Sequence, residues 1–548
     1  GRLGSTPPVS RRSGHPTLCG TVRLARLDLR LDRVRMPVWA VAVAGLVLVS
    51  GASVMSLYST AEQIAQYVSL IDISGNMTAV NSALNGPGFG FDHPNVGVIL
   101  VNEVAIWGAI GFAMLGIFGM ARHTRAEEEA QRTEILRSRM VGRHAGLASA
   151  ALTVGGSELL VGLVTFGGLS LLGFDAVGAA ALVLGYVAAG LLFAAVTAVA
   201  AQVASTSRAT VGLGIGALGL AYLVRAVGDM GPGLLSWLSP IGWVHRLRPY
   251  AGERWWVLLM FVAVVSVAGG LAVALSDRRN MGAGLVVQHL GPAHAGSITV
   301  HPTGLILRLQ KGSIIGWSVG LLVLGLAYGF VASDIEQMFI DNPELGRFIP
   351  AGAGSMTDSY LAYTLALGAM LAGGLAIASV LRMRAEESSG RLELLLARPV
   401  GRSRWAMDHC AVALVGVVVA LVGSGLGTGI GVALALGDSQ QVLRMTSASL
   451  ALLPLDLVLL GLAMLLVGVL PRLALLAWAG LAVVVLVGLF AEPFHLPDWL
   501  RACSPLEYLP SMPAEGFDVV AFVAVSAVGL GLVLIGRLGF RRRDIPAV

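Results

Sequence analysis

The chain has 548 residues, of which 56% are hydrophobic and 13% charged, and its mean hydropathy is +0.79. This balance excludes a soluble globular protein and indicates an integral membrane protein. The formal net charge is +5. The excess arginine lies in the connections on one side of the predicted membrane spans, so the positive charge does not indicate a nucleic-acid partner. The three cysteines, Cys19, Cys410 and Cys503, form no metal or redox motif, so no disulfide framework is expected.

Twelve transmembrane helices are predicted, because a bilayer core of ~30 Å needs about 20 apolar residues per helix. In chain order they cover residues 37–57, 97–119, 146–172, 176–203, 209–228, 255–275, 313–331, 359–381, 406–432, 447–470, 473–490 and 518–536. Residues 1–36 are expected to form a cytoplasmic tail and an amphipathic elbow. Residues 283–312 are expected to form a cytoplasmic linker and a second elbow.

The distribution of cations predicts the orientation. Most lysines and arginines lie in the amino terminus, the even-numbered connections and the carboxyl terminus, and the first connection (58–95) has none. By the positive-inside rule, both termini are cytoplasmic. Residues 1–20 contain no apolar stretch typical of a cleavable signal. Lys311 is the only lysine, and with the abundant Ala and Gly this favours a GC-rich bacterial genome, such as that of an actinobacterium. We therefore expect a multi-pass protein of the bacterial cytoplasmic membrane.

One charged segment occurs twice in this apolar chain. Arg125–Arg143 (RAEEEAQRTEILRSRMVGR) recurs as Arg384–Arg402 (RAEESSGRLELLLARPVGR), with more than half of the positions identical. Shorter matches in the same order pair 30–33 with 308–311, 239–243 with 504–508, and 278–281 with 542–545. Six spans separate equivalent points, so both halves enter the membrane in the same direction, as a parallel repeat. The predicted fold is all-α, with two six-helix transmembrane halves at 37–282 and 313–548.

Each copy of the charged segment, here called the island, is predicted to form an amphipathic cytoplasmic helix of about four turns. Glu128–Arg132 and Glu387–Arg391 have the i,i+4 spacing that favours a helix, and a glycine near the end of each copy suits a helix stop. Two interpretations stay open. The helix rests on lipid headgroups, or it docks a protein, which the acids favour because an anionic leaflet repels them.

The second copy resembles a known family. Its run from Glu386 to Arg402 is similar to the E-x-x-x-G-x-L-E-L-L-L-x-x-P-V-x-R element of ABC-2-type exporter permeases. The ending Phe540–Ile545 and the elbow pattern before Trp39 and Trp317 also resemble that family, in its fused twelve-span actinobacterial form (tetronasin-type or polyketide-antibiotic exporters). The first copy departs from the motif, because Met140 stands where the second copy has Pro399, and Ala130-Gln131 replaces the Ser-Gly pair.

The resemblance implies that the island is the coupling helix that meets the ATPase. The ATPase-coupling residues would be Glu127, Glu128, Arg132, Glu134, Gly142, Glu386, Glu387, Arg391, Glu393, Pro399 and Gly401. It further implies a transport permease rather than an enzyme, working with two copies of a separate ABC ATP-binding subunit that carries ATP and Mg. This chain would bind no cofactor directly. It would move hydrophobic drugs, antibiotics or lipid-like compounds outward by alternating access.

A phosphate-binding loop of the Walker A type needs Gly-Lys-Ser/Thr. The only lysine follows Gln310, so the sequence lacks this motif. The segment Gly425–Gly429 is glycine-rich, but it lies inside a predicted span, where close helix packing explains it better. ATP hydrolysis is therefore expected on another polypeptide.

Charged residues inside spans are costly and mark functional sites by default. We identify Glu103, Glu158 and Asp456 as candidates for a substrate path that favours cationic amphiphiles. The alternative is a neutral or hydrogen-bonded carboxyl that holds helices together. None of the three recurs at its partner position, which suggests an asymmetric role. The segments 234–256 and 492–516, rich in Trp and Pro, are either interfacial belts or short re-entrant hairpins that close an outer gate.

Two other function classes are considered. An ion-coupled secondary drug transporter also has twelve spans in parallel halves, and the in-span acids suit a proton relay. However, the Gly-x3-Asp-x2-Gly-Arg pattern of its 2–3 loop is missing. A membrane enzyme acting on lipid-linked substrates would need clustered Asp, His or Lys on an outward loop, and Asp92-His93 and Asp341 are isolated.

Overall fold

The computed structural model describes residues 17–72, 82, 85–130, 142–230, 233–279, 284–286, 296, 301–330, 332, 355–388, 390–397, 400–490 and 497–543. The chain forms two compact units, Gly1–Leu290 and Gly291–Val548. The division expected from the sequence was at 282/283, within the same linker.

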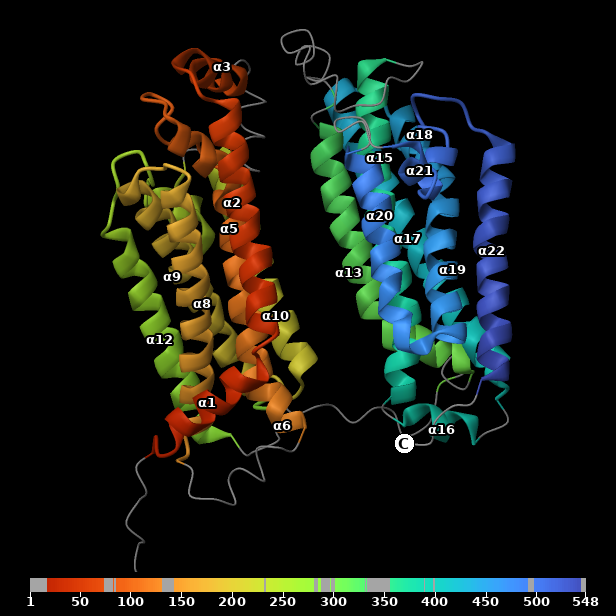
Figure 1. The fold of residues 1–548 in the computed structure, drawn as a ribbon, viewed down its shortest axis with the longest axis horizontal. Coiled ribbons are helices and arrows are strands. Elements are labelled where there is room, and N and C mark those ends of the chain that lie inside the picture. The colour runs from red at the N-terminus through yellow and green to blue at the C-terminus, as the bar shows by residue number, and fades with distance from the viewer. Residues whose placement is uncertain are drawn as a thin grey trace, which may run out of the picture. The chain divides into compact units, whose positions relative to one another are not determined.

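Twelve helices among the described residues are long and apolar enough to cross a membrane, which confirms the predicted number of spans and the all-helical fold. In the first unit they are α2 (Arg35–Leu57), α5 (Val96–Ala121) continuing through η1 (Arg122–Ala126) and α6 (Glu127–Glu129), α8 (Ala145–Leu171), α9 (Ala176–Val203), α10 (Ser207–Met230) and α12 (Val257–Arg278). In the second they are α13 (Pro302–Phe330), α15 (Met356–Ser388), α17 (Arg402–Leu436), α18 (Gln440–Ala451) with α19 (Leu453–Val469), η5 (Pro471–Leu476) with α20 (Ala477–Phe490), and α22 (Val519–Arg542). Figure 1 shows the helices of each unit running side by side.

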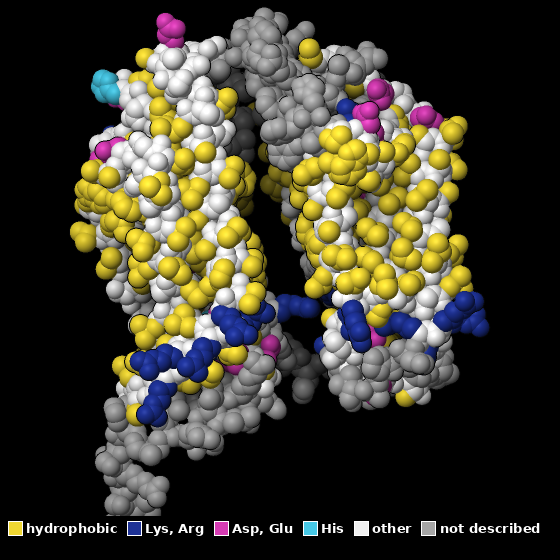
Figure 2. All heavy atoms as spheres, viewed as in Figure 1, with side chains coloured by type: hydrophobic (Ala, Val, Ile, Leu, Met, Phe, Trp, Pro, Cys, Tyr) yellow, Lys and Arg dark blue, Asp and Glu magenta, His cyan; other side chains and the backbone are white. Residues whose placement is uncertain are grey.

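The arginines define one end of each unit. In the first unit, α2, α8 and α10 begin at this end, and α5, α9 and α12 finish there. In the second unit, α13, α17 and η5 begin at this end, and α15, α19 and α22 finish there. We call it the arginine-rich end. Figure 2 shows apolar side chains over the middle of both units and Lys and Arg side chains gathered near one end of each. This arrangement suits spans that cross a bilayer.

Several helices begin or end at residues that cap them. Asn95 accepts a hydrogen bond from the amide of Val98 (3.0 Å), and Asp175 and Asp518 cap α9 and α22 in the same way. Gly437 ends α17 with a φ of +73°, a conformation that glycine adopts without steric cost.

In each unit, the second and fourth spans form the core. In the first unit, 67% of the most apolar stretch of α5 and 72% of that of α9 is buried. The same fraction is only 17–28% for α2, α10 and α12. The stacked rings of Phe112 and Tyr186 join the two central helices. In the second unit, α15, α17 and α18–α19 have the central place. The remaining helices bury one face and leave the other to lipid.

Glycines allow several helices to approach closely. A Cβ atom at Gly461 of α19 would lie 2.5 Å from the carbonyl oxygen of Gly529 in α22. The glycines Gly425 and Gly429 of α17 bring it against α18, where a Cβ would lie 2.6 Å from the Cα atoms of Thr446 and Val442. The packing interpretation of the segment 425–429 is confirmed.

The two elbows differ. The first is a separate helix, α1 (Thr21–Leu31), which packs against α8. The second, expected as a separate element at 308–311, is the first part of the unbroken helix α13. The difference lies at Asp32, which ends α1 and bonds to η1, whereas its counterpart Gln310 is buried within α13.

At the opposite end, short helices precede the last span of each unit. They are η2 (Leu235–Leu238) and α11 (Pro240–Arg246) in the first unit, and α21 (Asp498–Arg501) and η6 (Pro505–Tyr508) in the second. The repeated Ser-Pro corners adopt nearly the same backbone, with ψ 122° at Ser239 and 123° at Ser504, and both serines are fully buried. Trp243 packs in the core, whereas Trp256 is half exposed, so segment 234–256 packs partly against the helices of its unit.

Candidate functional site

The first part of each island continues the second span instead of starting a new helix. In the first unit, α5 runs on through η1 and α6 to Glu129. In the second, α15 extends to Ser388, and Gly390, with φ +70°, separates it from α16 (Arg391–Leu396). The predicted single four-turn helix is wrong for this copy, because the glycine turn interrupts it. Glu387 and Arg391 therefore are not helical i,i+4 partners.

The island acids Glu128 and Glu387 take part in the same ionic arrangement in both units. Glu128 accepts hydrogen bonds from Arg125 (2.5 Å) and from Nη1 of Arg279 (2.8 Å). Arg279 directly follows α12, so the contact joins the second span to the sixth.

In the second unit, Glu387 lies 3.2 Å from Arg384 and 2.6 Å from Arg543, which directly follows α22. The three residues stand at the positions equivalent to Arg125, Glu128 and Arg279 in the sequence repeat. We call each triad the repeated ionic cluster. It is present in both units and joins equivalent spans.

Both clusters are largely withdrawn from solvent. Glu387 is 4% exposed and Arg125 1% exposed, and the side chains of Glu128, Arg279 and Arg543 are 11–15% exposed. Charge-assisted bonds between arginine and carboxylate are among the strongest polar contacts, and partial burial reduces their screening. Each cluster therefore ties the arginine-rich ends of its two spans together.

The first cluster reaches further than the second. Nε of Arg125 donates to the carbonyl of Ala204 (2.9 Å), just beyond α9, and Nε of Arg279 donates to Gln202 (2.6 Å). In the second unit, Arg384 is 37% exposed and Arg402 instead donates to the carbonyl of Arg543 (3.2 Å). The first unit thus also fixes its fourth span.

A second tie joins the elbow to the second span. Asp32 lies 2.9 Å from Nε of Arg122 and 2.6 Å from Nε2 of His123. In the second unit, Arg382, which is equivalent to His123, donates to the carbonyl of Leu309 (3.0 Å). The arginine-rich end of the second span is therefore also tied to the elbow in the first unit and to the first span in the second.

Other predicted coupling residues have different surroundings. Arg391 and Glu393 are exposed on α16, and Glu127 is partly exposed. Glu386 lies 3.6 Å from Nε2 of His409, on the third span. Arg132, Glu134 and Pro399, like Asp341, lie outside the described residues.

The two island glycines lie next to the third span, and the helix that Gly142 was expected to end lies outside the described residues. Gly142 donates its amide to Cys19 (2.9 Å), and a Cβ there would lie 2.5 Å from the carbonyl carbon of Thr17. Gly401 is the N-cap residue of α17, and a Cβ would meet nothing within 4 Å.

Two of the in-span acids occupy similar buried places. Glu158 of α8 is 0% exposed, and a Cβ at Gly116 of α5 would lie 3.2 Å from its Oε1. Asp456 of α19 is 1% exposed, and a Cβ at Gly373 of α15 would lie 3.2 Å from its Oδ1. Neither carboxyl has a hydrogen-bond partner among the described residues. Glu158 lies still closer to the fourth span, because a Cβ at Gly190 of α9 would lie 2.4 Å from its Oε2.

Glu103 has a different environment. It is exposed on α5, and the hydroxyl of Tyr67 in α3 (Ala61–Asp72) donates to it at 2.5 Å. Asn102 donates to the same hydroxyl at 2.8 Å. Burial, followed by the charge of Glu103, raises the pKa of Tyr67, so its hydroxyl remains a donor. Glu103 therefore holds a helix, as the alternative interpretation expected.

Sequence reasoning missed Arg225. This residue lies inside the predicted span 209–228, is fully buried in α10 and lies 3.6 Å from Asp229. Asp229 also accepts a hydrogen bond from Ser236 in η2 (2.5 Å). The pair holds η2 on α10. The sequence could have identified Arg225, because placing an arginine in a membrane span costs as much free energy as placing a carboxylate there.

A cavity of about 300 Å³ lies beside the elbow tie, between α2, α5, α8 and α10. Asp32, Arg122 and His123 line its arginine-rich end, and Trp39 and Phe118, with ring centroids 6.0 Å apart, line its apolar part. Ser157, the neighbour of Glu158, also contributes to the wall. An ionic rim above aromatic walls suits an amphiphilic molecule.

Comparison with known proteins gives one consistent result. Residues 300–541 match the family model described as the C-terminal domain of the multidrug efflux system permease Rv1217c. Over 550 aligned residues, the chain is 35% identical to the multidrug efflux system permease protein Rv1217c of Mycobacterium tuberculosis (strain ATCC 25618 / H37Rv), and the alignment covers 98% of each chain.

Proposed function

The chain belongs to the family of the multidrug efflux permease Rv1217c, and from this premise we propose that it is the permease subunit of an ATP-driven ABC exporter. Its substrates are hydrophobic drugs, antibiotics or lipid-like compounds, which it moves out of the cell by alternating access. The observation that carries the proposal is the repeated ionic cluster, because it joins both copies of the island to the helices that must move.

The proposal assigns two roles within each island. Arg391 and Glu393, exposed on α16, contact the ATP-binding subunit, and Arg132, Glu134 and Pro399 belong to the same docking surface. Glu128 and Glu387 do not dock, because both are bonded inside their own unit. They transmit the displacement instead. Glu127 and Glu386, at the ends of the same spans, adjoin the docking surface.

The ionic contacts of each island explain how its displacement reaches the other spans. When the subunit pushes the island, the arginine-rich end of the second span moves with it. The sixth span follows because Glu128 holds Arg279 and Glu387 holds Arg543, and the elbow follows through Asp32. The movement changes the shape of the cavity beside Trp39, which lies between the first, second, third and fifth spans. An amphiphilic substrate bound there would be released as its walls separate.

The chain itself carries no Gly-Lys-Ser/Thr sequence, so the proposal places ATP and Mg on two copies of a separate subunit. The arginine-rich end lies in the cytoplasm of a bacterium, with both termini on that side of the cytoplasmic membrane. Glu158 and Asp456 lie on or next to the substrate path, where a cationic group of a substrate would find an unpartnered carboxyl. Glu103 keeps a holding role.

Co-purification tests this proposal. The full chain is expressed with a candidate ATP-binding subunit, and the complex is isolated through a tag on the chain. We expect two ATP-binding subunits per chain. One of them should be lost when Arg391→Glu and Glu393→Arg are combined, because the first island is unchanged. The matched control is Glu62→Gln, exposed on α3 at the opposite end. Isolation of the chain alone, with drug export driven by a proton gradient, would favour an ion-coupled transporter instead.

A further inference from the structure

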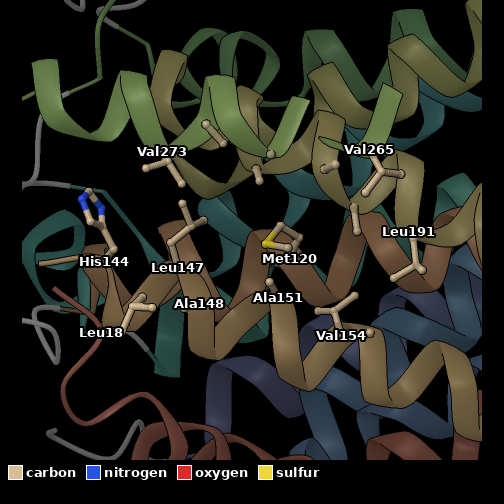
Figure 3. Close-up of a pocket in the computed structure, with 16 residues that line it drawn as sticks. Leu18, Met120, His144, Leu147, Ala148, Ala151, Val154, Leu191, Val265 and Val273 are labelled. Atoms are coloured by element: carbon tan, nitrogen blue, oxygen red, sulfur yellow. The ribbon is translucent and has the colours of Figure 1, made fainter. Parts of the chain in front are cut away.

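A second cavity, of about 310 Å³, lies inside the first unit at its arginine-rich end (Figure 3). It runs between α8, α9 and α12. Leu18 and His144 line one end of it, and Leu191 and Val265 line the other. Every lining side chain except His144 is apolar, so the cavity has almost nothing with which to bind a polar ligand.

The cavity is long. Its α8 lining runs from His144 to Gly155, which at about 1.5 Å per residue corresponds to about 16 Å. Its walls are apolar over that length, so an unbranched hydrocarbon chain can lie along them.

A glycine keeps this space open. Gly269 of α12 lines the cavity, yet a Cβ there would meet no atom within 4 Å. Close helix packing therefore does not require it. The equivalent position in the second unit is Val533 of α22, which is 4% exposed. The first unit thus has a glycine at this cavity, here called the slot, where the second unit has a buried valine.

The slot opens to the surroundings of the unit and ends at a basic surface. Ala151 and Val273 are exposed along its side, so a chain can enter laterally from a bilayer. Helix α1, which begins three residues after Leu18, exposes Arg23, Arg26 and Arg30 together with several apolar side chains. This is the pattern of a helix lying at a membrane surface, and its arginines complement a lipid phosphate.

We propose that the slot binds one acyl chain of a phospholipid from the leaflet at the arginine-rich end. The chain lies between α8 and α12, and the phosphate of the headgroup faces the exposed arginines of α1. The site is independent of the cavity beside Trp39, which has an ionic rim and lies on the α2 side of α8. Its occupant adds apolar contacts between α12 and α8, which Arg143 and His144 already join to Asp277 at the arginine-rich end.

The test uses a phosphatidylglycerol with a photoreactive diazirine in the middle of one acyl chain. The full chain is reconstituted in vesicles that contain this lipid, irradiated, and mapped by mass spectrometry. We expect labels on residues 144–155 and 265–273. In Gly269→Leu, labelling there should fall by at least about tenfold, because the leucine displaces several methylenes and each favours burial by about fourfold.

Gly270→Leu is the matched control, since Gly270 is exposed and a Cβ there also meets nothing within 4 Å. It should keep the wild-type labels. If Gly269→Leu fails to fold, Ala151→Phe at the open side replaces it. Equal labelling in the slot and control variants would overturn the proposal, as would displacement of the lipid by a polycyclic drug. The experiment needs neither ATP nor transport, so it can fail while the proposed export stands.

Discussion

Removing the charge of Glu387 tests the role of the repeated ionic cluster most simply. Glu387→Gln keeps the shape of the side chain but leaves Arg543, 14% exposed, and Arg384, 37% exposed, without their carboxylate. Loss of a buried partner costs about 3–5 kcal/mol, whereas a bond to a charged group contributes about 1.5–3 kcal/mol. Because both arginines can reach water, the lower range applies, about 2 kcal/mol.

The same change in the first unit should cost more. Glu128→Gln leaves Arg125, only 1% exposed, with a carbonyl as its remaining partner. We therefore expect a loss of about 3 kcal/mol in the coupling between second and sixth spans. Since 1.4 kcal/mol is tenfold, transport should fall by at least about tenfold in either variant if the tie must remain closed during the cycle.

The assay compares drug export at equal membrane levels of each variant. The ATP-binding subunit should still co-purify, because the docking surface is unchanged. Exchanging the charges, with Glu387→Arg combined with Arg543→Glu, should restore part of the export that either single reversal abolishes. Wild-type export by Glu387→Gln, or a double reversal no better than the singles, would refute the reasoning.

Three further predictions concern orientation and stability. A membrane-impermeant maleimide applied to intact cells should label the exposed Cys503 and not Cys19. Tyr67→Phe should lower the free energy of unfolding by about 1–2 kcal/mol, seen as a lower Tm, because Glu103 loses its donor. Burial, with Arg225 nearby, lowers the pKa of His245 to about 3. Its stability contribution is therefore complete above about pH 6.5 and falls, by up to about 1.4 kcal/mol per pH unit, as the pH decreases towards 3.

Each of these has a contrary outcome. Labelling that survives Cys503→Ser but is lost in Cys19→Ser would reverse the orientation. An unchanged melting temperature in Tyr67→Phe would show that α3 is held by its apolar contacts alone. For His245, a Gln variant should lose the acid sensitivity. The same pH dependence in wild type and variant would assign it to other groups.

The sequence predicted the spans well because hydropathy acts over about 20 residues, the length that a bilayer imposes. It predicted the island helix of the second unit poorly. One residue, Gly390, decides that the acids finish α15 while Arg391 starts α16. A helical pattern of charges cannot reveal a glycine in the left-handed conformation.

The ionic cluster could be found only in part. The two segments that form the cluster, the island and the arginines after the sixth span, both appeared as sequence repeats. Their pairing joins residues 151 and 156 positions apart, which no local pattern encodes. For Glu158 and Asp456, comparison by position predicted asymmetry, and the structure has the two buried carboxyls on different spans of their units, the third and the fourth.

The central claim is that ATP hydrolysis by a separate subunit drives export through this chain. Inside-out vesicles that contain the chain and its ATP-binding subunit provide the direct measurement, with a fluorescent hydrophobic drug as the substrate. The account predicts ATP-dependent, vanadate-sensitive accumulation that Glu387→Gln reduces by about tenfold. Accumulation driven by a proton gradient without ATP, and abolished by Glu158→Gln or Asp456→Asn, would contradict it.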